Sequence, residues 1–347
     1  MIVLVFDRLC MMYNFLALFP NRIFPVLPGL SICILIAIVA NFLSRWGLPA
    51  MLGALGVGML FHFLLAKAVY CAHFKSGIDL STRMILRFGV ALLGARITLT
   101  QVADLGFGMI IVSMIAIFLL IWGSMILGRK VGLGSAFGAL SGGAVAICGA
   151  SAAMAISSVL PTTPAKEKQT TLVVVGVTAL STLAMVLYPA LVVMLGLEPV
   201  AAGKLLGGTI HDVAQVVGAG YMISPEVGDY ATIVKLFRVA MLLPVVLILA
   251  LIFRVQDMGR TRPLRNFPLF LLGFVALVLI NSAGFLPQNI IALLSDLSAA
   301  CLLVAVAGLG VKTSFRDFIH MGWRPAVMIM GQTLFLLAFF TAFVLCV

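Results

Sequence analysis

The sequence contains little charge, and most of that charge is basic. Only 10% of its 347 residues are Asp, Glu, Lys or Arg, whereas 63% are apolar, and the 22 basic residues outnumber the 11 acidic ones. A soluble domain usually has about 25% charged and 45–50% apolar residues. The composition therefore excludes a water-soluble enzyme and an ordinary nucleic-acid-binding protein. It predicts an all-α, polytopic transmembrane helical bundle with the lipid bilayer as its main partner.

Cysteine motifs are also missing. The six cysteines form no CxxC pair and no Cys/His cluster, so we expect packing residues, no bound metal and no cofactor. The first apolar stretch is interrupted at Asp7 and Arg8, and no small-residue cleavage pattern follows it. We expect residues 1–27 to be an N-terminal extension, not a cleaved signal peptide. Residues 28–347 then form a single transmembrane transporter domain.

Long apolar runs fill the rest of the chain. A membrane span needs roughly 20 apolar residues. Eleven candidate segments meet or approach this length, at about 28–45, 48–66, 83–103, 107–127, 134–159, 170–195, 201–221, 228–253, 267–283, 288–312 and 324–346.

Basic loops predict how the chain is oriented. The arginine-rich 254–266 connection is assigned to the cytoplasm by the positive-inside rule. Counting from this loop predicts a cytoplasmic N-terminus and a periplasmic C-terminus in a bacterial inner membrane.

Two glycine-rich segments complicate the count. If all eleven segments spanned, Lys166 and Lys168 would lie outside, although Arg129 and Lys130 also look cytoplasmic. The conflict disappears if 134–159 and 201–221 are broken or re-entrant segments that enter and leave on the same side, which leaves nine spans. The alternative is that both are glycine-rich full spans and the lysines violate a statistical rule.

A short motif occurs twice. Residues 91–98 and 307–314 both contain Leu-Gly, a basic residue two positions later and a hydroxyl two positions after that. In each copy another glycine follows twelve residues after the first, at Gly106 and Gly322. The topology count places the copies in opposite directions. Such echoes are typical of transporters built from inverted repeats.

The 207–220 run carries an acid and a base beside glycines. On a helical path, His211, Asp212 and Gln215 would share one polar edge. His211 could titrate near neutral pH, and Asp212 could carry a proton or coordinate a cation. We therefore predict that this pair couples transport to H+ or Na+, with Thr209 and Gln215 on the substrate. The alternative is a buried polar cluster that ties a broken helix to its neighbours.

The other predicted binding residues suit an anion. If a half-helix begins near Gly149, its N–H groups and the Ser151 hydroxyl would form an anion site without a charged side chain. Small-residue packing between helices is the competing interpretation. Lys235 and Arg238 lie inside segment 228–253, and Arg238 is far from either end. They would bind an anionic substrate, or Arg238 would neutralise Asp212.

Three stretches resemble a known family. Residues 147–152 (ICGASA), 208–220 (GTIHDVAQVVGAG) and 234–242 (VKLFRVAML) are similar to the YeiH-type bacterial inner-membrane proteins, which are labelled sulfate exporters. The resemblance covers about residues 28–346. It implies a multi-pass fold with inverted repeats and crossed broken helices, akin to the cation:proton antiporter and bile-acid symporter group. Because the family's activity is itself inferred, it implies a substrate class but no established catalytic residues.

Together these features predict a secondary active transporter that exports a small anion such as sulfate or an organosulfonate. A cation or neutral-solute transporter of the same fold is the main alternative. An intramembrane enzyme using Ser151, His211 and Asp212 is disfavoured, because adjacent residues project about 100° apart on a helix and cannot form an in-line relay. The sequence leaves a homodimer open.

Overall fold

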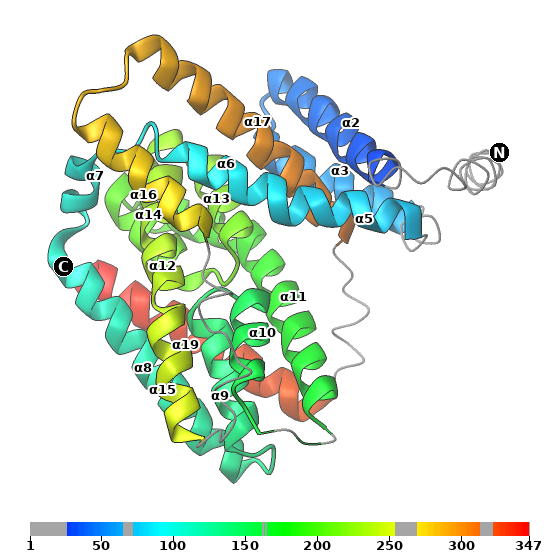
Figure 1. Ribbon diagram of the computed structural model, residues 1–347, viewed down its shortest axis with the longest axis vertical. Coiled ribbons are helices and arrows are strands. Elements are labelled where there is room, and N and C mark those ends of the chain that lie inside the picture. The colour runs from blue at the N-terminus through cyan, green and yellow to red at the C-terminus, as the bar shows by residue number, and fades with distance from the viewer. Residues whose placement is uncertain are drawn as a thin grey trace. The chain divides into compact units, whose positions relative to one another are not determined.

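Helices make up the architecture of the chain. The computed structural model describes residues 26–64, 72–161, 163, 165–253, 269–312 and 322–346. Within these ranges the chain forms helices and no β-strand (Figure 1). The described part has six helical stretches long and apolar enough to cross a membrane, namely Leu27–Trp46, Gly106–Lys130, Lys166–Met194, Pro225–Ile252, Gln288–Lys312 and Trp323–Cys346. The predicted all-α polytopic class is confirmed.

Each of the eleven predicted segments overlaps helix, but the third is misplaced. It was expected at 83–103, whereas the helical path there runs from α5 (Ala72–Leu80) to Leu93, and residues 94–98 are not helical. Lys75 and Asp79 lower the hydropathy of this helix and hide it from a search for apolar runs. Most of the N-terminal extension and the arginine-rich 254–266 loop lie outside the described residues.

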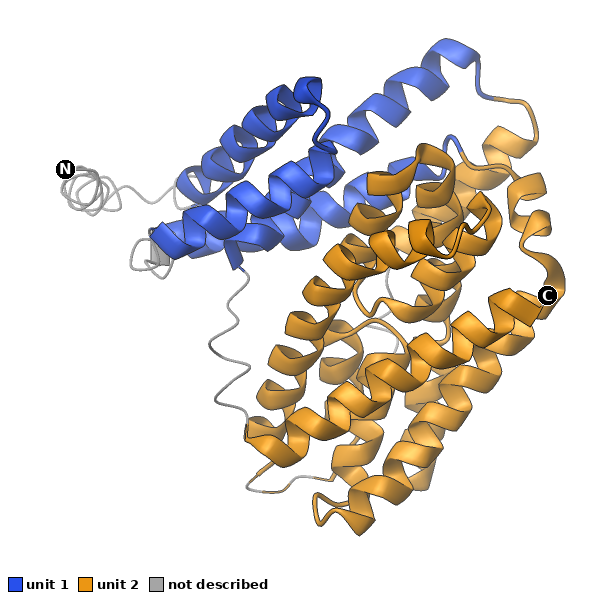
Figure 2. Ribbon diagram, turned by 180° about the vertical axis from the view of Figure 1, so that it is seen from behind, with its two compact units in different colours: residues 1–96, 286–313 blue, residues 97–285, 314–347 orange. Residues whose placement is uncertain are grey.

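The chain divides into two compact units, shown in different colours in Figure 2. The first comprises residues 1–96 and 286–313. Its helices are α2 (Leu27–Leu43), the 3-10 turn η1 (Ser44–Trp46), α3 (Ala50–Leu64), α5, the π-helical turn η2 (Ser81–Ile85), α6 (Leu86–Leu93) and α17 (Gln288–Lys312). The α17 helix packs against α2, α3 and α6.

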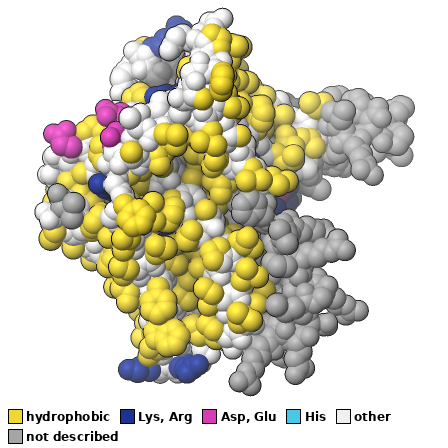
Figure 3. All heavy atoms as spheres, turned by 60° about the vertical axis from the view of Figure 1, so that its left-hand side comes forward, with side chains coloured by type: hydrophobic (Ala, Val, Ile, Leu, Met, Phe, Trp, Pro, Cys, Tyr) yellow, Lys and Arg dark blue, Asp and Glu magenta, His cyan; other side chains and the backbone are white. Residues whose placement is uncertain are grey.

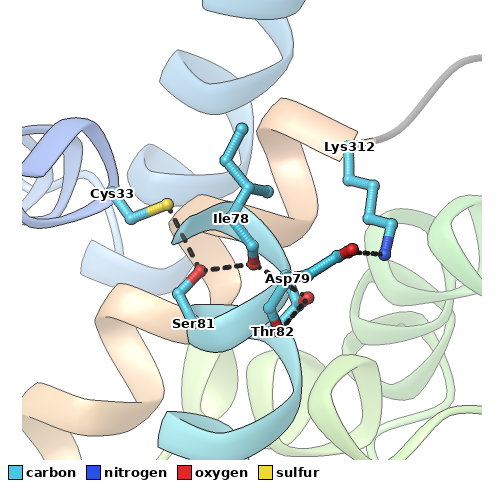
Figure 4. A network of polar contacts seen from close by, with 6 residues as sticks. All are labelled: Cys33, Ile78, Asp79, Ser81, Thr82 and Lys312. Carbon is cyan, nitrogen blue, oxygen red and sulfur yellow. Dashed lines mark hydrogen bonds and ion pairs between the residues drawn. The ribbon is translucent and has the colours of Figure 1, made fainter. Parts of the chain in front are cut away.

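Polar side chains fasten α5 and η2 to their neighbours in the first unit (Figure 4). The Ser81 hydroxyl donates to the Ile78 carbonyl at 2.9 Å and contacts Cys33 Sγ at 3.3 Å. Lys312, at the end of α17, forms an ion pair with Asp79 at 2.6 Å. Because both charged side chains are partly exposed, this pair adds only modest stability.

The second unit comprises residues 97–285 and 314–347. Its helices are α7 (Leu99–Asp104), α8 (Gly106–Lys130), α9 (Ser135–Ala146), α10 (Ala150–Ser158), α11 (Lys166–Met194), α12 (Pro199–Thr209), α13 (Val213–Ile223), α14 (Pro225–Ala240), α15 (Leu242–Ile252), α16 (Leu269–Ser282) and α19 (Trp323–Cys346). The α14 helix packs against both α12 and α13, and α9 packs against α8.

Both glycine-rich segments are broken helices, as predicted. The first is interrupted between α9 and α10 at residues 147–149, and the second between α12 and α13 at residues 210–212. Whether they re-enter or span stays a prediction. Most of their glycines serve close packing: a Cβ on Gly207 would strike α14 at Val234, and one on Gly208 would strike the Phe340 ring of α19. Only Gly149 lies in a break with a positive φ, of 64°.

The two copies of the repeated motif lead into matching structures. Gly106 is the first residue of α8 and has a φ of 74°, and Gly322 directly precedes α19 with a φ of 86°. The α8 helix begins close to where α19 ends, so the two helices run in opposite directions (Figures 1 and 2). This geometry agrees with the predicted inverted repeat.

Large apolar side chains lie on the surface of both units. Phe63, Phe107, Met194 and Leu251 are 69–83% exposed. Figure 3 shows hydrophobic side chains across the face in view, with Lys and Arg at its lower end and in further small groups toward its top. Exposed apolar area on this scale is expected where the solvent is lipid.

Close helix contact in the first unit gives a direct test of the fold. A Cβ on Gly58 would lie 2.6 Å from the Ala307 carbonyl oxygen of α17, whereas one on Gly56 meets nothing within 4 Å. We expect Gly58→Ala to lower the free energy of unfolding by about 1–3 kcal/mol through overpacking. Gly56→Ala, in the same helix, should be neutral or slightly stabilising. Thermal unfolding in detergent measures both, and equal midpoints would contradict the packing.

Candidate functional site

The two helix breaks bring backbone carbonyls into the interior of the second unit. A helix end leaves its last carbonyls without intrahelical partners and carries about half a negative charge. The α9 helix ends at Ala146 and α12 at Thr209, and all the residues around these two ends are buried. These two carbonyl ends together require hydrogen-bond donors or positive charge from other parts of the chain.

Arg238 on α14 supplies most of these donors. Its side chain is 1% exposed. Its Nε donates to the Ala146 carbonyl at 2.8 Å, and its Nη1 donates to the carbonyls of Gly207 and Gly208 at 2.8 and 2.7 Å. Its Nη2 donates to the carbonyls of Val145 and Ala146 at 3.1 and 2.5 Å. One guanidinium therefore closes the ends of both half-helices.

Lys235, one turn earlier on α14, completes the arrangement. Its Nζ is fully buried and donates to the Ile147 carbonyl at 2.5 Å and to the Ile210 carbonyl at 3.0 Å. Each of these carbonyls comes from the residue that follows a half-helix. The two cations therefore bridge the first break to the second and offset the negative ends of both helices.

Asp212 caps the start of the half-helix α13. Its backbone is extended, and its carboxylate accepts a hydrogen bond from the Ala214 N–H at 2.9 Å. The Ser181 hydroxyl of α11 accepts from the backbone N–H groups of His211 and Asp212 at 3.2 and 3.1 Å. The helical path considered for residues 211–215 is thus wrong at its first two positions, because the chain becomes helical only at Val213.

His211 is fixed from the other side by α19. Its Nε2 lies 2.9 Å from the Thr333 hydroxyl, which in turn donates to the Ile329 carbonyl at 2.9 Å. Since a hydroxyl has one proton, Thr333 can only accept from the ring, so Nε2 carries the proton. The buried Nδ1 atom then has a lone pair and no hydrogen-bond partner.

Gln215 and Thr209 point to protein groups. The Gln215 amide donates to the Thr182 hydroxyl of α11 at 2.7 Å, while its buried Oε1 has no hydrogen-bond partner. The Thr209 hydroxyl is buried and donates to the Leu205 carbonyl of its own helix at 2.6 Å. Thr209 is therefore part of the helix end, whereas Gln215 keeps an acceptor available.

The start of α10 differs from the other half-helix ends at the two breaks because no side chain caps it. Gly149 occupies the cap position with a φ of 64° and a ψ of −125°, and no side-chain hydrogen bond caps the helix there. Ala150 is half-buried and Ser151 is exposed. The Ser151 hydroxyl contacts the Cys148 carbonyl, at 3.5 Å, and the Cys148 thiol. This helix start, as predicted near Gly149, is positive, uncapped and accessible.

Gly149 also connects the two breaks. A Cβ at this position would lie 3.8 Å from the backbone and Cβ of His211, which is ordinary van der Waals contact. The predicted residues Gly149, His211, Lys235 and Arg238 are therefore brought together around one crossing. A group of three or more His, Cys, Asp or Glu residues able to hold a metal ion is absent from the described ranges.

Several residues of this crossing escaped the sequence analysis. Ser181, Thr182 and Thr333 hold the second break through their hydroxyl groups. Gln332, beside Thr333, donates to the hydroxyls of Ser124 on α8 and Ser141 on α9 at 2.9 Å each. Hydroxyl residues are common in membrane helices, so their type and position alone do not reveal these partners.

The role of Arg238 at the crossing can be tested by stability. Arg238→Met would leave several buried carbonyls without donors, and we expect it to lower the free energy of unfolding by about 3–5 kcal/mol. Arg129→Met, on an exposed side chain of α8, should change it by less than about 0.5 kcal/mol. Thermal unfolding of the two purified variants would show this. A midpoint for Arg238→Met equal to that of Arg129→Met would contradict the assignment.

Known proteins with similar sequences lie in one group of membrane proteins. A family profile described as "Conserved hypothetical protein 698" matches residues 28–329. A UPF0324 membrane protein of Chlorobaculum tepidum is 45% identical over 312 residues, which cover 89% of this chain and 86% of that protein. The UPF0324 membrane protein TauZ of Paracoccus pantotrophus is 45% identical over 321 residues, covering 91% of this chain and 94% of its own length.

More distant relatives extend the same group. A UPF0324 membrane protein of Corynebacterium glutamicum is 32% identical over 312 residues, with 88% of each chain covered. No solved structure matches the chain significantly. The YeiH-type resemblance is thereby confirmed, since that family is this one. The chain belongs to the UPF0324 family of multi-pass membrane proteins.

Proposed function

We propose that this protein is a secondary active transporter that exports a small anion, such as sulfate or an organosulfonate, across the bacterial inner membrane. Transport proceeds by alternating access and is coupled to H+ or Na+ through His211 and Asp212. Family membership supports a membrane protein with a transporter-like role. The paired broken helices support it further, because transporters bind substrates and coupling ions at such breaks.

The observation that carries the anion proposal is the contrast between accessible and buried positive groups. Lys235 and Arg238 are at most 1% exposed, whereas Ser151, at the uncapped start of α10, is exposed. An anion can therefore reach the free N–H groups of α10 without displacing the two cations from their carbonyls. Backbone N–H groups at a helix start bind sulfate and similar oxyanions well.

The surrounding charge favours the same ligand. Lys235 and Arg238 carry two positive charges at the crossing, and Asp212 supplies one negative charge beside them. With a neutral His211, the crossing has a net positive charge in a poorly screened setting. In this proposal Gly149 and Ser151 contact the anion, and Lys235 and Arg238 attract it while they hold the two helix ends. Gln215 offers its carboxamide to the substrate, and Thr209 only shapes the helix end.

A cation or neutral solute is the second candidate. It is favoured by two buried acceptors without hydrogen-bond partners, His211 Nδ1 and Gln215 Oε1. With Asp212, these atoms could coordinate a positively charged group. An enzyme receives no such support: in the described part of the chain the Ser151 hydroxyl contacts Cys148, and His211 Nε2 contacts Thr333. The proposal includes no second subunit.

Sulfate flux tests the function, and two glycines test the site. Gly149 and Gly196 both have a positive φ, of 64° and 60°, and space for a Cβ. Alanine is strained at both positions, and more so at Gly149, whose ψ of −125° lies outside the left-handed helical region; only Gly149→Ala disturbs the start of α10. We expect radiolabelled sulfate to leave proteoliposomes that contain the wild-type protein faster than it leaves protein-free liposomes. The rate should depend on the pH gradient. Gly149→Ala should slow this flux about fivefold, the effect of roughly 1 kcal/mol at a helix end.

The Gly196→Ala variant should keep the wild-type flux. No flux of sulfate or an alkylsulfonate under any ion gradient would refute the proposed substrate class. Equal flux in the two alanine variants would refute the site at α10 and leave the substrate class standing.

The variant Asp212→Asn distinguishes an anionic substrate from a cationic one. Asparagine caps a helix as well as aspartate does, so α13 should remain intact while one negative charge is lost. We expect sulfate binding, measured by thermal shift, to stay equal or tighten a few-fold, because the crossing becomes more positive. Glu226→Gln, an exposed acid in the first turn of α14, is the control and should have no effect. If Asp212→Asn lost the thermal shift with sulfate and Glu226→Gln kept it, the result would favour the cation alternative.

A further inference from the structure

Thr333 determines which nitrogen of His211 is free. Its hydroxyl proton goes to the Ile329 carbonyl in its own helix, so its oxygen accepts the Nε2 proton of the imidazole ring. Hydrogen bonding at one ring nitrogen sets the tautomer of the other. The neutral ring therefore presents Nδ1 as a lone pair in the interior of the crossing, and this buried atom has no hydrogen-bond partner.

We infer that His211 Nδ1 is the atom that takes up the coupling proton, and that Thr333 is the positioning residue that keeps this atom available. The inference rests on the proposed function and deepens it by selecting H+ over Na+. An imidazole nitrogen is a poor ligand for a hard cation such as Na+ but a good proton acceptor. A hydronium ion in the access path gives its proton to the Nδ1 lone pair and leaves as water. The Nε2–H bond to Thr333 is kept throughout.

The groups around the ring decide when this proton can bind. The α14 helix contributes Lys235 and Arg238, both positive, and the second break contributes the carboxylate of Asp212. The first break contributes the Val145 carbonyl and, beside Lys235 and Asp212, the Cys148 thiol, while α11 and α19 present the hydroxyls of Ser181 and Thr333.

The Val145 carbonyl is available as an acceptor for a proton on the His211 ring. It lies close to the ring and already accepts from Arg238 Nη2 at 3.1 Å. Protonated His211 would therefore share one carbonyl with a guanidinium and add a third positive charge beside two others. Coulomb repulsion opposes this state unless a negative charge arrives as well.

An anion at the start of α10 would supply that negative charge. The Gly149 cap lies against the backbone and Cβ of His211, so the proposed anion site and the ring are neighbours. Anion binding should therefore promote proton uptake, and by linkage proton uptake should tighten anion binding by the same factor. The coupled species is then the anion together with one proton.

Nitrogen-15 NMR of the purified full-length protein in detergent tests the inference. The chain has four histidines, and His211→Gln identifies the ring signals of His211 by their loss. Without sulfate, we expect the wild-type ring to be neutral with its proton on Nε2. Sodium sulfate should increase its proton affinity about tenfold, within the usual range for coupled sites. Sodium chloride at equal ionic strength is the control for screening.

Variants at position 333 test the positioning role. Thr333→Val keeps the shape but removes the acceptor, so the Nε2–H preference and the sulfate-linked proton uptake should both be lost. Thr333→Ser keeps the hydroxyl and should restore both. A change caused only by altered packing would not depend on the hydroxyl in this way.

Three results would overturn the inference: a wild-type ring protonated on Nδ1, equal sulfate-linked proton uptake in His211→Gln, or a Thr333→Val ring with unchanged tautomer and proton affinity. The wild-type measurement stands even if Thr333→Val fails to fold. If sulfate has no effect on the wild type, the proposed anion site fails. The tautomer then still decides the assignment of Nδ1, since Nε2–H supports it and Nδ1–H overturns it.

Discussion

The second unit depends on two cationic side chains of α14, which donate hydrogen bonds to the carbonyl ends of two other helices. The α9 and α12 helices stop inside the protein, where each unmet carbonyl is expensive because no water can replace its hydrogen bond. Arg238 and Lys235 bond to six of these carbonyls, those of Val145, Ala146, Ile147, Gly207, Gly208 and Ile210. The breaks are thus tolerated because α14 carries a guanidinium and an ammonium one turn apart. Without that helix, neither interruption would be a stable structure.

The carbonyl ends of the two breaks are closed, but their two amide ends differ, and this difference supports the proposed function. The α13 helix begins with its own carboxylate, Asp212, whereas α10 begins at Gly149 with no side-chain cap. One positive helix end is therefore satisfied internally, and the other, which has no side-chain cap, is the proposed anion site. The hydroxyls of Ser181 and Thr333 fix the backbone and the ring of His211 beside this open end. In the proposed mechanism, substrate binding and protonation therefore take place side by side.

Much of this arrangement could be read from the sequence, because hydropathy and backbone chemistry are local properties. The apolar segments, the two interruptions and the start of a half-helix at Gly149 all follow from composition along short windows. The partners of Lys235 and Arg238 could not be predicted, since a buried cation shows its charge in the sequence but not whether carbonyls or a ligand neutralise it. Thr333 was missed for a related reason: its partner His211 is 122 positions away. The glycines of α12 were read as marks of a break, and the break does follow them, but they also allow α14 and α19 to approach.

The central claim is that an oxyanion binds to the amide end of α10 and not to the buried cations. The most direct measurement is an experimental structure of the wild-type protein with selenate, a sulfate analogue whose selenium atom is located by anomalous scattering. The account predicts a selenium peak beside the backbone of Gly149 and Ser151, with Lys235 and Arg238 still bonded to their carbonyls. A peak held by the side chains of Lys235 and Arg238, with those carbonyls released, would contradict it, as would a selenate-saturated protein with no peak at α10.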